Sequence, residues 1–115
     1  MKVCKDHEVE AKPVDMDGAA DVVMRIVIGP DDDSNNMIMR HFTVGPGGHT
    51  PHHVHDFEHL VRVLDGTGVV VDGEGNRHAL SPGHSVFVPS DERHQFLNAG
   101  DTPFTFTCTV LKAKA

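Results

Sequence analysis

Seven short apolar runs, separated by turn-forming residues, are the feature that most limits how this chain can fold. Each run is rich in Val, Ile, Thr or Phe, and Gly, Pro, Asp and Asn fill the intervals. No stretch of ten or more residues keeps the 3.6-residue apolar period of an amphipathic helix. We interpret as strands the runs at residues 22–28, 37–44, 58–64, 68–71, 85–88, 95–97 and 104–111. The pattern predicts an all-β, antiparallel sandwich or barrel.

The length of 115 residues allows one apolar core and is too short for a second. We therefore expect a single domain at residues 21–115. The polar, irregular segment at residues 1–20 is expected to form a flexible tail, an extra strand or an arm that pairs with a neighbouring subunit.

The charge and cysteine content exclude several classes of protein. A net charge of −7, from 17 acidic and 10 basic residues, argues against a nucleic-acid binder, which would present a basic surface. No apolar run approaches the roughly 20 residues of a membrane-spanning helix, and no secretory signal pattern is evident. Cys4 and Cys108 are too few for a disulfide framework. We expect a cytoplasmic protein with reduced thiols and neither a nucleic-acid nor a membrane partner.

Ten histidines, five of them between positions 49 and 59, depart most from ordinary composition. In an extended strand, residues two or four apart point to the same face, so His53, His55 and His59 would converge. His94, just after the turn at residues 89–93, is the candidate for a fourth imidazole. Histidine is the commonest metal ligand, and this spacing predicts a site for one divalent transition metal. The alternative is a set of surface histidines in a polar loop.

Two further histidines lie close to the predicted site. His52 has the opposite parity and is expected to be exposed or to lie behind the metal ligands. His49 precedes the strand and could act as an acid or base at the barrel mouth, although a solvated loop histidine is the simpler interpretation.

Several other residues are candidates for substrate binding. Phe104, Phe106 and Cys108 share one face of the last strand and could line a pocket around the metal, or serve only as core packing. Arg40 could bind a substrate carboxylate if it faces inward, and its orientation is left open. Arg62 is expected to point outward.

Two long spaced motifs resemble those of the cupin superfamily. The first is Gly47, five residues, His53-Val54-His55, three residues, His59, six residues, Gly66. The second is Gly83, five residues, Pro89, one residue, Asp91, two residues, His94, three residues, Asn98. Both follow the family's order and spacing over nearly half of the chain.

The resemblance implies a jelly-roll β-barrel with a metal on the motif histidines, and a homodimer, because small cupins commonly pair through their sheets. The family's usual metal-binding glutamate is replaced by His59, so the resemblance is to the smaller group of cupins with four histidine ligands. Glu58 has the wrong parity to replace that glutamate. Asp91 stands where glycine is frequent, in a turn where aspartate tolerates left-handed backbone.

Four neutral imidazoles leave the charge of a divalent metal uncompensated, so the centre should favour anionic partners. We expect Mn or Fe, with Zn, Ni and Cu also compatible. The first hypothesis is a dioxygenase-like oxidoreductase acting on a small oxygenated organic molecule. The second is a non-redox lyase or isomerase acting on a sugar acid, and the third is a non-catalytic ligand- or metal-binding protein. No general base is evident beyond the ligands, which keeps the third hypothesis open.

Overall fold

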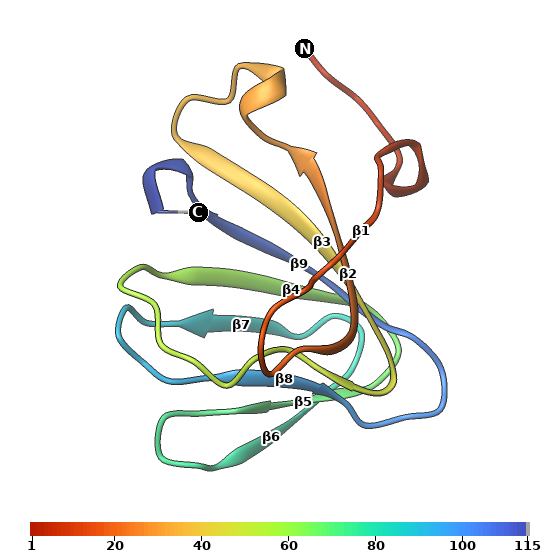
Figure 1. The fold of residues 1–115 in the computed structure, drawn as a ribbon, viewed down its shortest axis with the longest axis vertical. Coiled ribbons are helices and arrows are strands. Elements are labelled where there is room, and N and C mark those ends of the chain that lie inside the picture. Colours follow the sequence, from red (N-terminus) through yellow and green to blue (C-terminus); the bar gives the residue numbers. More distant parts are fainter. Residues whose placement is uncertain (115) are drawn as a thin grey trace.

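The computed structural model describes residues 1–114, which fold almost entirely into β-strands (Figure 1). Three short 3-10 turns complete the elements, η1 (Asp6–Glu8), η2 (Pro30–Asp32) and η3 (Lys112–Lys114). The strands are β1 (Lys12–Pro13), β2 (Ala20–Ile28), β3 (Met37–His49), β4 (His59–Asp65), β5 (Gly68–Val71), β6 (Arg77–Leu80), β7 (Ser85–Val88), β8 (Gln95–Asn98) and β9 (Phe104–Leu111). Within these 114 residues, no helix has the length and apolarity needed to cross a membrane.

Antiparallel pairing joins the strands into one curled sheet in the order β6-β5-β8-β3-β9-β4-β7, with β2 on β3 and β1 on β2. Most of β3 pairs with β9, whereas its last residue, His49, pairs with Leu97 of β8. The strand therefore runs from one half of the barrel into the other, and Figure 1 shows both halves curling around a common interior. This architecture confirms the predicted antiparallel jelly-roll barrel.

All seven expected strands are present, with ends that differ by a few residues. The sequence did not predict β6, because three of its four side chains are exposed and only Leu80 is buried. Nor did it specify β1, which lies within the expected arm and pairs with β2 of the same chain through Lys12–Met24 and Pro13–Val23. A polar edge strand offers little apolar signal, since its position depends on backbone hydrogen bonds.

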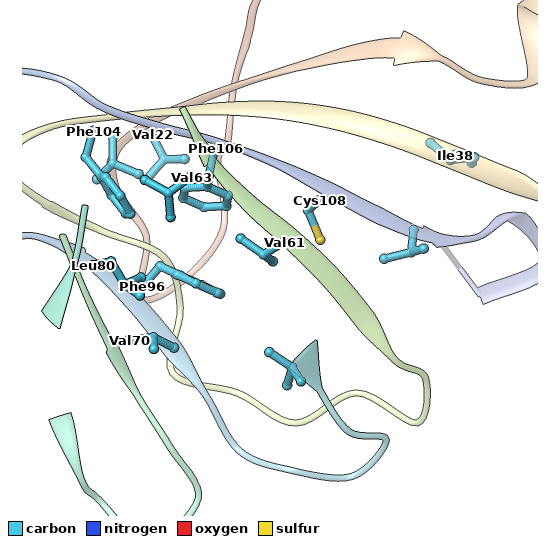
Figure 2. Close-up of a cluster of buried hydrophobic side chains, with 13 residues drawn as sticks. Val22, Ile38, Val61, Val63, Val70, Leu80, Phe96, Phe104, Phe106 and Cys108 are labelled. Atoms are coloured by element: carbon cyan, nitrogen blue, oxygen red, sulfur yellow. The ribbon is translucent and has the colours of Figure 1, made fainter. Parts of the chain in front are cut away.

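The core lies between the two halves of the barrel and depends on alternation along β9. Phe104, Phe106, Cys108 and Val110 are buried, and the threonines between them are partly exposed. Figure 2 shows Phe104, Phe106 and Cys108 following one another along the interior. The alternation predicted for the last strand is therefore confirmed.

An exposed apolar row crosses the outer face of the sheet. Met39, Thr109, Leu60 and Phe87 lie opposite one another on the successive strands β3, β9, β4 and β7. Leu60 is 52% exposed and Phe87 is 56% exposed. The homodimer stays a prediction, and this row is a candidate surface for it.

Gly66 and Gly75 offer a matched test of the backbone. Both have positive φ, 78° and 85°. A Cβ on Gly66 would lie 2.2 Å from the carbonyl oxygen of Pro103, whereas one on Gly75 would have no atom within 4 Å. We expect Gly75→Ala to lower the free energy of unfolding by about 1–2 kcal/mol, the cost of left-handed backbone. Gly66→Ala should cost about 3 kcal/mol or more, because overpacking adds to that strain. Chemical denaturation measures both values, and equal losses would contradict this account.

Candidate metal centre

Backbone pairing brings the two histidine-bearing segments together. His53 and His94 form an isolated antiparallel bridge, with N–H to carbonyl hydrogen bonds of 3.3 Å and 3.2 Å in the two directions. His59 opens β4, and both His59 and His94 are buried. His55 lies in the loop between the bridge and β4 and is partly buried. Side chains about 40 residues apart in sequence thus face one another.

Three imidazoles lie close enough together to share one ion. One ring nitrogen from each of His55, His59 and His94 lies within 4.8 Å of the other two. Nδ1 of His55 is 3.2 Å from Nε2 of His59. Nδ1 of His94 is 2.9 Å from the carbonyl oxygen of Glu92, to which it donates when protonated, and this fixes the ring.

His53 borders this group of three without belonging to it. Its ring centroid lies 4.1 Å from that of His55 and 6.0 Å from that of His94. The assignment of His53 as a fourth ligand therefore stays a prediction.

A loop, and not the continuous extended strand expected from the sequence, brings the histidines together. Residues 54–58 form a loop, and β4 begins only at His59. The loop is held by a 2.7 Å hydrogen bond from the N–H of Asp91 to the carbonyl of His55, and by Phe57, whose ring stacks on His55 at 4.8 Å. Asp91 has the left-handed backbone expected from sequence, with φ 69°. His52 and Glu58 are exposed.

Burial keeps the imidazoles neutral. For His59, burial and the neighbouring His94 and His55 lower the pKa to about 3. For His55, burial and the neighbouring His53 and His94 lower the pKa to about 4. Burial is also the main cause of the lowered pKa values of His53 and His94. Neutral imidazole is the form that binds a metal, so these residues are ready to do so at neutral pH.

The cluster fits a divalent transition metal. Its donors are neutral imidazoles, which suit Mn, Fe, Ni, Cu and Zn. In addition, Nδ1 of His59 is buried and has no hydrogen-bond partner. Such an orphaned donor or acceptor costs free energy unless a ligand or water satisfies it. The replacement of the family's glutamate by His59 therefore leaves a site whose donors are all histidines.

The cluster lies at a pocket of about 430 Å³, within the range of about 300–1,000 Å³ typical of small-molecule sites. Its walls are mostly apolar and include Val14, Met16, Phe42, Phe57, Phe96 and Phe106. The first two belong to the N-terminal arm, which therefore forms part of the pocket wall.

The structure brings most of the predicted substrate-binding residues to this pocket. Arg40, Phe106 and Cys108 line it, so Arg40 faces inward. Phe104 is absent from the lining, because it is fully buried in the core against Gly68. Arg62 is exposed, as expected.

Sequence reasoning missed several parts of the pocket wall, among them Phe42, Phe57, Phe96 and the N-terminal arm. Phe57 shares parity with His55 and His59, a signal that would have identified it. The arm carries no comparable signal, since its apolar residues Val14 and Met16 stand among charged neighbours.

The chain matches a protein-family profile and is similar to solved structures of other proteins. The family profile described as "Cupin domain" matches residues 40–110. The polyketide cyclase RemF from Streptomyces resistomycificus is 29% identical with a TM-score of 0.91, and the match covers 96% of this chain and 79% of that one. A predicted oxalate decarboxylase from Thermotoga maritima is 22% identical with a TM-score of 0.85, over 96% and 99% of the two chains, and shows the shared fold alone.

A curated relative matches over a shorter span. The 1-methylthio-D-xylulose 5-phosphate methylsulfurylase of Rhodospirillum rubrum is 36% identical over 72 residues. The match covers 63% of this chain and 46% of the relative, so it spans about half of that protein's length.

Metal content provides the first test of the cluster. We expect the purified protein to retain about one divalent metal per chain after dialysis, as measured by elemental analysis, because the neutral imidazoles are already assembled. Alanine at His55, His59 or His94 should abolish retention, and alanine at His53 should weaken it at least about tenfold. His52→Ala is the control and should bind normally. Full retention by His59→Ala protein would exclude this site.

Acid stability provides the second test, on protein stripped of metal with a chelator. The unfolded state binds protons at His55 and His59 near pH 6.5, whereas the folded state binds them only near pH 4 and pH 3. Stability present above pH 6.5 should therefore be lost progressively as the pH falls toward 4. The melting temperature of His59→Phe protein should fall less between pH 7 and pH 4.5 than that of wild type or of the exposed control His52→Phe. Identical slopes would contradict the burial of neutral His59.

Proposed function

This chain is a member of the cupin family, and on that premise we propose that it is a metal-dependent enzyme that acts, without net oxidation, on an enolisable oxygenated organic molecule. One observation carries the proposal. A cluster of neutral imidazoles lies at an apolar pocket in which the acidic lining residue, Asp15, is exposed. With a divalent metal bound, such a site would favour an anion over a neutral or cationic ligand.

A divalent metal on His55, His59 and His94, with His53 as a fourth ligand, would supply Lewis acidity and favour the enolate form of a carbonyl compound. The imidazoles carry no charge, so they would leave the positive charge of a bound metal uncompensated. The phenylalanine walls make the pocket apolar, and electrostatic interactions are stronger in surroundings of low dielectric constant. Isomerisations, eliminations and ring closures that begin with loss of a proton next to a carbonyl belong to this class.

Two relatives support an oxygenated carbon compound as substrate. RemF is named as a polyketide cyclase, and the R. rubrum protein is named for a methylthio-xylulose phosphate. Both names denote oxygenated carbon compounds, which is the chemical class proposed for this chain.

A dioxygenase-like oxidoreductase that uses Mn or Fe is the second candidate. The neutral donor set favours it as well, because an uncompensated positive centre also attracts reduced dioxygen. The two candidates differ in their requirement for oxygen and for a redox-active metal.

Hydrogen–deuterium exchange discriminates between these functions. We would follow exchange at the α-carbon of 1,3-dicarbonyl compounds and keto acids by NMR in D₂O, without oxygen, for the Zn, Mn and Fe forms. Exchange should be accelerated by the Zn form, lost in His59→Ala and retained in His52→Ala.

Two results would count against the proposal. Turnover that requires oxygen together with Mn or Fe would favour the dioxygenase. Neither exchange nor oxygen consumption with any of the metals would favour a binding protein.

A further inference from the structure

Arg40 carries a positive charge into the pocket with few partners there. Its side chain is partly buried on β3 and lines the pocket beside Cys108. One Nη donates to Sγ of Cys108 at 3.4 Å, and a thiol is a weak acceptor. Nε is buried and has no hydrogen-bond partner. Since a guanidinium offers five N–H donors, four of them on its two Nη atoms, the Nη atoms keep donors for a ligand in the pocket.

No carboxylate balances this charge within the described chain. The ion pairs found in residues 1–114 involve Lys2, His41 and His78 as the basic partners. The positive charge of Arg40 reaches the histidine cluster, where it contributes to the lowered pKa values of His55 and His59. A partly buried, unpaired guanidinium is costly, and an anionic ligand would offset that cost.

The pocket wall beside Arg40 is aromatic. Its guanidinium carbon lies 5.3 Å from the ring centroid of Phe42. Phe42 stacks on Phe106 with centroids 5.2 Å apart, and Phe106 stacks on Phe96 at 4.8 Å. Figure 2 shows Phe96, Phe106 and Cys108 facing the same interior. Stacked rings next to a cation favour a planar, conjugated ligand over a puckered sugar.

We propose that Arg40 binds the carboxylate of a planar, conjugated keto or hydroxy acid whose adjacent oxygen faces the histidine cluster. The planar guanidinium suits a carboxylate, which it binds through two parallel hydrogen bonds. The adjacent-oxygen contact rests on the proposed metal-dependent function, whereas the contact with Arg40 requires no metal. The inference narrows the substrate from any enolisable compound to an aromatic or conjugated acid.

Calorimetric titration with a matched pair of probes tests the inference. The probes are 1-hydroxy-2-naphthoate and its neutral amide, each titrated into chelator-treated and Zn-loaded protein. Wild type should bind the acid at least about tenfold more tightly than the amide in both forms. Arg40→Met should remove this preference, and Arg40→Lys should retain part of it.

Arg62→Met is the matched control, because Arg62 lies on β4, which β9 separates from β3, is exposed and donates to Ser85 at 3.0 Å. It should keep the full preference for the acid. Melting temperatures establish that each variant is folded. If Arg40→Met is not folded, Arg40→Lys serves as the test.

The outcomes separate this inference from the proposed function. The role of Arg40 would be overturned if Arg40→Met still prefers the acid, or if wild type binds both probes equally. If Arg40→Met does not fold, a full preference for the acid in Arg40→Lys would overturn it. A preference that depends on Arg40 and is unaffected by zinc would support the anion site while counting against contact with the metal centre.

Discussion

The antiparallel bridge between His53 and His94 is the contact on which the candidate site depends. It extends the pairing of β3 with β8, in which the N–H of Thr50 donates to the carbonyl of Phe96 at 2.9 Å. The 2.7 Å hydrogen bond from Asp91 to His55 then ties the second motif to the loop of the first. Because these contacts are made by the backbone, the pairing of the two segments places the imidazoles side by side.

The same barrel sets the electrostatics of the pocket. Burial lowers the pKa of the clustered imidazoles, so they enter the site as neutral donors. Arg40 adds a fixed positive charge to the lining of the same pocket, and the phenylalanines around it make the walls apolar. A pocket with this combination is suited to an organic anion, which links the replacement of glutamate by His59 to the chemistry we propose.

The sequence predicted most of the fold, because the strands of the core alternate between apolar and polar side chains, as β9 does. It did not predict β6, which holds its place through pairing with β5, or the position of the arm against the pocket. Spacing identified the histidines that meet, although a loop and not a continuous strand brings them together. Arg40 has the same parity on β3 as the buried residues Ile38 and Val44, a signal that would have predicted its inward orientation. The core position of Phe104 depends on which end of the barrel it occupies, and parity carries no such information.

The central claim is that this histidine cluster holds one divalent metal. The most direct measurement is a crystal structure of zinc-reconstituted protein, with anomalous diffraction recorded on both sides of the zinc absorption edge. The account predicts one strong anomalous peak per chain, bonded to ring nitrogens of His55, His59 and His94 and, as a fourth ligand, of His53. Zinc bound elsewhere, or absent from the cluster at saturating concentration, would contradict it.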